Sequence, residues 1–337
     1  MGREAMRAAI RAATLVATLA LAACGGGDGD SGGSDDVPPV RLEDLCVNSG
    51  CGERTILLDI PGAENLTFSP DGRLFVSSGS GVFEIHKNAD GSFRADSISP
   101  EACGYTGLAI RRGYLYSACG DGRFWATKLD AAPQLQLIHT MSGMCIANGT
   151  ALGADGRIYV VDEPLNVCVP DPKIKRLTID PADPMKVTHE EVFVQGSALG
   201  LLAVGVGNVL RFPNGLQADG RRFYGTDGGS IFTVDLQPDG SAGEVTPIFF
   251  EVDVHDDLGL AGDDGLLLAN FLTGRITLIS RDGEKLQATA PGTFSFPSSV
   301  RLGRPPMFEP TDILVTETGV LADQSLPLDH LSLFRRK

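Results

Sequence analysis

A unit that recurs every roughly 40–50 residues is the feature that most constrains how this chain can fold. The clearest copies are AENLTFSPDGRLFVSS (63–78), ANGTALGADGRIYVVD (147–162), PNGLQADGRRFYGTD (213–227) and DDLGLAGDDGLLLAN (256–270). Weaker copies begin at Tyr105 and Pro297. Each copy has a short apolar strand, a turn that contains Gly or Pro, and a second strand rich in Val, Ile, Leu, Phe or Tyr.

Six such units between about residue 55 and the C-terminus predict an all-β fold, a six-bladed β-propeller with a central metal-binding channel. A single small sheet cannot bury both of its faces, whereas sheets stacked radially bury them against one another. A β-sandwich is the rival all-β fold, but it does not explain a repeated turn at a fixed offset.

The N-terminal segment has the pattern of an export signal. Three arginines precede or border an apolar run that ends in Leu-Ala-Ala-Cys24, and this run is too short to span a bilayer. The pattern resembles a bacterial lipoprotein signal, in which Cys24 carries the lipid; a cleaved signal with a chance Cys is the alternative. The resemblance to Gram-negative lipoproteins, with Gly25 after the Cys, implies the outer membrane, on the periplasmic side or the cell surface. We predict a signal peptide (1–23), a lipidated Cys with a flexible tether (24–54) and a propeller (55–337).

The formal net charge of −15 disfavours nucleic acid as a partner, because an acidic protein repels phosphate backbones. The expected partners are a small-molecule substrate and, through Cys24, a membrane. Since a propeller is self-contained, a monomer is expected.

Six cysteines remain after Cys24, and an even number in an exported chain indicates disulfides. Six cysteines allow 15 pairings. We favour pairs of sequence neighbours, which are Cys46–Cys51, Cys103–Cys119 and Cys145–Cys168. No paired CxxC spacing points to zinc.

The Asp-Gly turn of the four clearest copies serves as a reference point for counting back into the first strand, which lines the channel in a propeller. Seven residues before this Asp stand Glu64 in the first copy, Asn148 in the third and Asp257 in the fifth. The fourth copy is shorter, but Asn214 occupies the equivalent strand start. All four side chains offer oxygen atoms.

Four converging oxygen ligands suit a hard cation. Calcium binds six to eight oxygens in irregular geometry, and water can complete its shell. Softer metals prefer Cys or His, which these positions lack. We therefore predict a Ca²⁺ site, although other divalent cations could occupy it.

Residues 58–335 resemble the senescence marker protein/gluconolactonase family, in the motifs ENLTFSPDGRLFVS, ANGTALGADGRIYVVD, FPNGL and FYGTD. Its relatives include diisopropyl fluorophosphatase and, more distantly, paraoxonases and strictosidine synthases. The resemblance implies a six-bladed propeller with a catalytic divalent metal, usually calcium. It also implies that Glu64, Asn148, Asn214 and Asp257 are the ligands.

Two positions depart from the family pattern. The family often has Gly after the first Glu, where this chain has Asn65, and Asp-Gly at the fifth site, where it has Asp257-Leu258. Asp256 is therefore a rival ligand if the strand slips by one residue.

The resemblance implies hydrolysis of lactones or esters. A bound cation would polarise the carbonyl group, and a carboxylate would activate water; we assign that role to Asp257. His255 lies two residues earlier, on the same side of a regular strand, and is a candidate proton shuttle. The alternative for His255 is a solvated loop residue. No GxSxG or GxxxxGK[ST] motif is present.

The apolar insertion from Gln195 to Phe212 has two interpretations. It is a buried outer strand of the fourth blade, or it lies over the channel mouth and favours hydrophobic substrates. In the second case Phe212, Phe294 and Phe296 would add to an apolar wall.

The leading prediction is thus a lipid-anchored, calcium-dependent hydrolase of lactones or esters. The alternatives are a non-catalytic, calcium-binding propeller that serves as a cell-surface binding module, and a strictosidine-synthase-like propeller without a catalytic metal.

Overall fold

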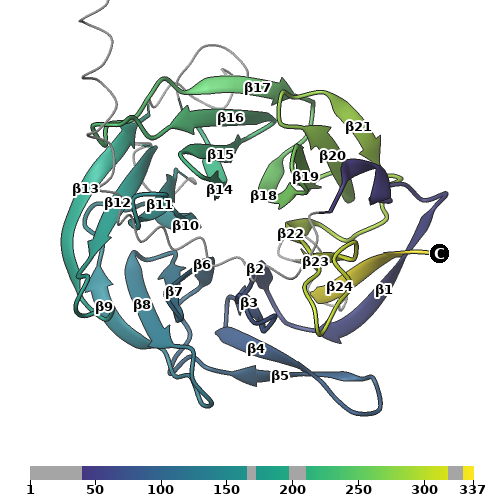
Figure 1. The fold of residues 1–337 in the computed structure, drawn as a ribbon, viewed down its shortest axis with the longest axis horizontal. Coiled ribbons are helices and arrows are strands. Elements are labelled where there is room, and N and C mark those ends of the chain that lie inside the picture. Colours follow the sequence, from purple (N-terminus) through teal and green to yellow (C-terminus); the bar gives the residue numbers. More distant parts are fainter. Residues whose placement is uncertain (1–39, 165–171, 197–209, 318–328) are drawn as a thin grey trace, which may run out of the picture. The chain divides into compact units, whose positions relative to one another are not determined.

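The computed structural model describes residues 40–164, 172–196, 210–317 and 329–337. Within these residues the chain forms one short 3-10 helix, η1 (Leu42–Asp44), and strands β1 to β24, which make six four-stranded sheets. The sheets surround a common centre (Figure 1). The predicted all-β, six-bladed propeller is confirmed. No helix in the described ranges is long and apolar enough to cross a membrane.

In the first three blades the strands run from the centre to the rim in sequence order (Figure 1). These strands are β2 (Ala63–Phe68), β3 (Leu74–Ser78), β4 (Val82–Lys87) and β5 (Phe93–Ser97); β6 (Tyr105–Arg111), β7 (Tyr114–Cys119), β8 (Arg123–Lys128) and β9 (Gln136–Thr140); β10 (Ile146–Leu152), β11 (Ile158–Glu163), β12 (Lys173–Ile179) and β13 (Val187–Gln195).

The fourth and fifth blades repeat this order, and the sixth takes its outer strand from the start of the propeller. These strands are β14 (Pro213–Asp219), β15 (Arg222–Asp227), β16 (Ser230–Asp235) and β17 (Thr246–Phe250); β18 (His255–Ala261), β19 (Gly265–Asn270), β20 (Arg275–Ser280) and β21 (Lys285–Ala288); β22 (Pro297–Leu302), β23 (Ile313–Glu317), β24 (His330–Arg336) and β1 (Gly52–Asp59).

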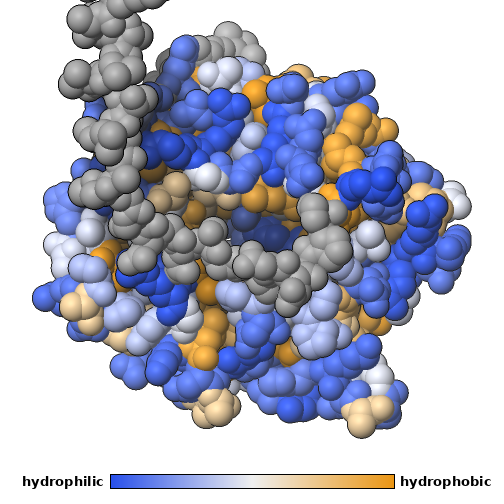
Figure 2. All heavy atoms as spheres, in the orientation of Figure 1, coloured by the Kyte–Doolittle hydropathy of each residue, from blue (hydrophilic) through white to orange (hydrophobic). Residues whose placement is uncertain are grey.

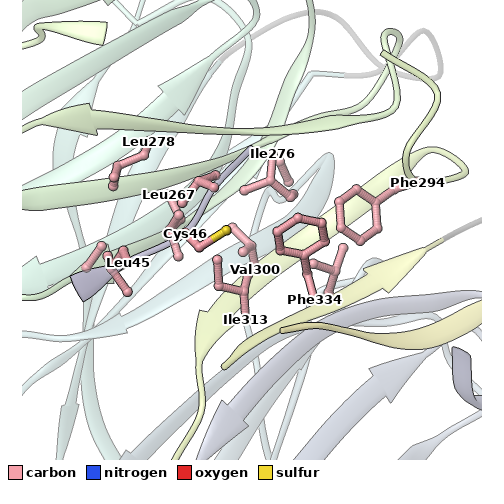
Figure 3. Close-up of a cluster of buried hydrophobic side chains, with 13 residues drawn as sticks. Leu45, Cys46, Leu267, Ile276, Leu278, Phe294, Val300, Ile313 and Phe334 are labelled. Atoms are coloured by element: carbon pink, nitrogen blue, oxygen red, sulfur yellow. The ribbon is translucent and has the colours of Figure 1, made fainter. Parts of the chain in front are cut away.

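The pairing of β1 with β24 closes the ring. The two strands are antiparallel, with Gly52 opposite Arg336 and Asp59 opposite His330. The preceding residues Leu45–Val47 are buried in a cluster with side chains of the fifth and sixth blades, among them Phe294 and Phe334 (Figure 3). Full burial of one such apolar side chain is worth about 1.5–3 kcal/mol. Ordered contacts with the propeller therefore begin before the predicted boundary at residue 55.

Two of the predicted disulfides are present, Cys46–Cys51 and Cys103–Cys119. The first lies just before β1, and the second joins the segment before β6 to the end of β7. Cys168 lies outside the described residues, so its pairing with Cys145 stays a prediction. The signal peptide, Cys24 and most of the tether also lie outside them.

Neighbouring blades share apolar cores. Tyr159 and Phe193 of the third blade contact Phe223 of the fourth, and the Tyr159 and Phe223 ring centroids are 4.4 Å apart. A polar contact joins the second and third blades, where Glu190 on β13 is paired with Lys175 and hydrogen-bonds His139 at 2.6 Å. The blades are therefore held together by apolar packing and by a partly buried polar contact.

A carboxylate at the end of the second strand holds the chain where it enters the innermost strand. Asp162 Oδ1 accepts a hydrogen bond from the backbone N–H of Ile146 at 3.1 Å. Asp227 Oδ1 accepts one from Arg211, and Glu317 Oε2 accepts one from Ser295. These residues end the sequence copies VVD, GTD and VTE, so their recurring acids have a structural explanation: they position the innermost strands.

Candidate functional site

Each of the six innermost strands carries one extra residue just after its first pair with the neighbouring strand or, in β10, just after its second. In β10, for example, Ala147 pairs with Asp162 and Thr150 with Val160, so that Asn148 and Gly149 together oppose Val161. A β-bulge of this kind turns a side chain out of the regular alternation. The first bulge residues are Glu64, Thr106, Asn148, Asn214, Asp256 and Ser298.

Hydroxyl side chains on the second strands satisfy the backbone groups that these bulges free from the ladder. Ser77 Oγ accepts a hydrogen bond from the Asn65 N–H at 3.0 Å. Thr226 Oγ1 accepts one from the Gly215 N–H at 2.7 Å and donates one to the Asp256 carbonyl of the next blade. The bulges are thus built into the fold and hold their side chains at one level.

Two of the six first bulge residues have partners in the backbone of the next blade. Thr106 donates its hydroxyl to Ala147 O at 2.6 Å, and Ser298 donates to Ala63 O at 2.9 Å. The four others carry carboxylate or amide oxygens: Glu64, Asn148, Asn214 and Asp256. The structure therefore brings Glu64, Asn148 and Asn214 into one phase of the repeat, as the sequence suggested.

The register corrects the phase expected in the fifth blade, where Asp256 rather than Asp257 matches Asn148. His255 pairs with Asn270 as Ala147 pairs with Asp162, which makes Asp256 the first bulge residue. Counting back seven residues from Asp264 misses the first bulge residue by one position, because the two turns differ in length. Strand pairing ends at Leu152 opposite Ile158 in the third blade and at Ala261 opposite Gly265 in the fifth.

Asp257 is the second residue of its bulge and is held by three donors on one oxygen. Its Oδ2 accepts hydrogen bonds from Asn65 Nδ2 at 3.0 Å, Ser299 Oγ at 2.7 Å and Arg301 Nη2 at 2.9 Å. Its buried Oδ1 accepts no hydrogen bond from any residue in the described ranges. Asp257 is thus oriented by one oxygen while the other stays without a donor.

Glu163 belongs to the same cluster, although the sequence did not single it out. It ends β11 opposite Ile146 and is 3% exposed. Its Oε2 accepts a hydrogen bond from Asn148 Nδ2 at 2.8 Å, and its Oε1 accepts one from Asn214 Nδ2 at 3.3 Å. The signal in the sequence is a second acid directly after Asp162, in VVDE.

Burial and mutual repulsion raise the pKa values of the clustered carboxyl groups. Loss of contact with water on burial raises the pKa of Glu64 to about 8, and the charges of Glu163 and Asp257 add to this effect. Burial raises the pKa of Glu163 to about 7, against the hydrogen bonds from both amides. The pKa of Asp256 is raised well above its usual range by burial, then by Glu64 and Glu163.

This cluster fits a hard cation in its chemistry. Its donors are carboxylate and amide oxygens, and the bare Oδ1 of Asp257 is a buried acceptor. A positive charge would favour the ionised form of these three carboxyl groups, against the burial that raises their pKa values. In the described part of the chain no three His, Cys, Asp or Glu side chains form a metal-binding group by themselves. Any cation here would therefore depend on the amides as well.

Close approach of neighbouring strands explains the glycines in the second bulge position. A Cβ at Gly149 would lie 2.3 Å from Asn214 O, and one at Gly215 would lie 2.4 Å from Asp257 Oδ1. The Asn148-Gly149 pair, which looks like a hairpin turn in the sequence, is therefore a bulge inside a strand.

The structure does not bring His255 together with the carboxylate cluster. His255 is fully buried beside Phe249, and neither ring nitrogen has a hydrogen-bond partner among the described residues. Burial lowers the pKa of His255 to about 4, opposed by the charges of Glu251 and Asp253. It is not a solvated loop residue. His255 was expected to lie on the same side of the strand as Asp257. This expectation fails because the bulge breaks the regular alternation of side chains in β18.

Two members of the predicted aromatic wall, Phe294 and Phe296, lie in different surroundings. Phe294 is buried in the apolar core between the fifth and sixth blades and contacts Phe334. Phe296 is partly exposed and contacts Phe271, with ring centroids 5.2 Å apart. Figure 2 shows a hollow near the centre of one face with hydrophilic residues at its floor. Residues 197–209 lie outside the described ranges, so both interpretations of the insertion remain open.

The fold and the phased polar ring define a six-bladed propeller with an axial cluster of oxygen donors. Solved structures share this fold. A gluconolactonase from Xanthomonas campestris aligns with a TM-score of 0.64 and 17% identity, over 90% of this chain and 96% of that one. The calcium-binding protein regucalcin from Agrobacterium tumefaciens gives 0.62 and 16%, over 84% and 93%.

A luciferin-regenerating enzyme gives a TM-score of 0.61 at 16% identity, over 85% of this chain and 95% of that one. At these identities the similarity shows the fold, which is that of the predicted gluconolactonase-like family. No protein-family model matches the chain, and no curated protein matches it either.

Proposed function

We propose that this protein is an exported, lipid-anchored, metal-dependent hydrolase of lactones or esters. The observation that carries the proposal is the phased set Glu64, Asn148, Asn214 and Asp256, which four different blades present at one level. A structural neighbour named as a gluconolactonase supports the substrate class.

Calcium is the cation that we propose for this site. Its preference for oxygen ligands and its tolerance of irregular geometry match a mixed set of carboxylates and amides. Glu64, Asn148, Asn214 and Asp256 would hold it. When bound, it would polarise the carbonyl group of the substrate and stabilise the negative charge that develops on its oxygen.

Asp257 is the residue that we propose as the general base. Asn65, Ser299 and Arg301 fix its Oδ2, which leaves Oδ1 to accept a proton from water. The water oxygen then adds to the carbonyl carbon, the ester C–O bond breaks, and the leaving oxygen takes up the proton that Asp257 removed from water, which restores the carboxylate. The product of a lactone is a hydroxy acid.

A panel of lactones and aryl esters, each assayed with calcium and with excess chelator, tests the proposed function. We expect hydrolysis that chelator removes and calcium restores, and that Asp257→Asn removes while His255→Ala keeps it. Calcium binding without hydrolysis of any panel member would instead favour a binding module. Membrane fractionation of cells that express the wild type or Cys24→Ala tests the lipid anchor; release of the variant alone is expected.

A further inference from the structure

The two amides of the candidate site share one acceptor. Asn148 and Asn214 come from neighbouring blades, yet the Nδ2 group of each donates to a different oxygen of the Glu163 carboxylate. An asparagine amide has an oxygen end and an NH₂ end of nearly the same shape, so its hydrogen-bond partners decide which end faces a ligand.

We propose that Glu163 is a positioning residue that fixes both amides, so that their NH₂ groups point to Glu163 and their oxygens stay available to the cation. This inference rests on the proposed function, because it assigns a purpose to the amide oxygens. Glu163 has both carboxylate oxygens engaged by the amides and acts through them.

Only an ionised carboxylate can perform this task at both amides at once. A carboxylate accepts hydrogen bonds on both oxygens, whereas a glutamine of the same shape has one acceptor and one donor. In Glu163→Gln, one asparagine can keep its orientation. The other would face the new NH₂ group and would turn its own oxygen away from the axis to accept from it.

The location of Glu163 is consistent with this role. The residue ends β11, which pairs with β10, and β10 in turn contacts β14, where Asn214 lies. It is also 3% exposed, so water competes little for the two hydrogen bonds. Asp162, its neighbour in the chain, instead holds the backbone of Ile146.

Calcium titration by calorimetry of the full mature protein is the first test. We expect Glu163→Gln to bind calcium about 10–100-fold more weakly, the usual cost of removing a residue that orients metal ligands. Glu53→Gln, the same change at an exposed position of β1, is the matched control and is expected to bind as the wild type does. Wild-type affinity in Glu163→Gln would overturn the proposal.

A double variant separates orientation from general damage to the fold. In Glu163→Gln with Asn148→Asp, the glutamine NH₂ can donate to the carboxylate introduced on β10, while the glutamine oxygen still accepts from Asn214. The number of carboxylates is then that of the wild type. We expect most of the lost affinity to return. A double variant that binds no better than Glu163→Gln would refute the proposal.

The metal-free protein supplies a readout that does not depend on cation binding. The side-chain amide signals of Asn148 and Asn214, assigned with the respective Asn→Asp variants, are expected to show slow hydrogen exchange in the wild type. One of the two should shift and exchange faster in Glu163→Gln. Unchanged signals would exclude the orienting role. Changed signals in a protein that binds no calcium would keep the orientation and reject the proposed function.

Discussion

Gly149→Ala tests whether the innermost strands are as closely packed as the bulges indicate. The added Cβ would lie 2.3 Å from Asn214 O and 2.6 Å from Leu216 N. An ordinary contact needs about 3.4 Å, so β10 and β14 would have to separate by about 1 Å. Both opposing atoms belong to the backbone, which cannot turn aside as a flexible side chain can.

Overpacking of this kind costs about 1–3 kcal/mol. Replacing Gly by Ala also stabilises by about 0.4–1 kcal/mol through the unfolded chain, so we expect a net loss of about 1 kcal/mol. In a domain of this size that loss lowers Tm by about 2–4 °C. Gly79→Ala is the control, because a Cβ there meets no atom within 4 Å and should leave stability unchanged or slightly higher.

Denaturant unfolding of both variants, with the wild type alongside, measures the difference. Because the displaced strand carries Asn214, calcium affinity should fall in Gly149→Ala and stay unchanged in Gly79→Ala. Equal stabilities of the two variants, within about 0.5 kcal/mol, would refute the close approach of the strands.

Three further outcomes follow from the structure. Asp256→Asn should weaken calcium binding more than Glu163→Gln does, whereas Asp257→Asn should lower kcat by about 10²–10⁴-fold and affect binding less; steady-state kinetics and calorimetry distinguish the two. Calcium at 100 times its Kd should add about 2.7 kcal/mol to the free energy of unfolding, and chelator should remove it, as followed by thermal melts. Burial raises the pKa of Glu190, but hydrogen bonds from Lys175, His139 and Ser142 lower it to about 2. The stabilisation relative to Glu190→Gln is therefore complete above about pH 4.5 and lost as the pH falls towards 2. The shift sets an upper limit of about 3 kcal/mol, which solvent access reduces to about 1 kcal/mol; urea unfolding at several pH values measures it.

The sequence predicted the architecture because each blade repeats the same local chemistry. The alternation of apolar strands with Gly-containing turns recurs six times, and six sheets form. The repeat also located Glu64, Asn148 and Asn214, since a common phase along the chain becomes a common level on the innermost strands. Pairing of sequence neighbours predicted two disulfides for the same local reason.

The fifth blade shows where counting along the sequence fails. The distance from a turn to a bulge depends on the length of both the turn and the strand, and the β18–β19 turn is shorter than the β10–β11 turn. The register, which only the structure supplies, selected Asp256. The same bulge moved His255 off the side expected for it. Neither effect is visible in residue types, because a bulge has no fixed sequence signature outside its glycines.

Asn65 and Asp257, which directly follow Glu64 and Asp256 in the chain, are linked in three dimensions. Both take the second bulge position, which in the second, third and fourth blades is Gly107, Gly149 and Gly215. Asn65 Nδ2 donates to Asp257 Oδ2, and Arg301 contacts both side chains from the sixth blade, which lies between theirs. An Asp257 with Gly at position 65 would lose one of three donors, and an Asn65 with Gly at position 257 would lose its acceptor. The pair therefore forms one unit with Arg301, and that unit leaves a single oxygen of Asp257 free beside the proposed cation ligands.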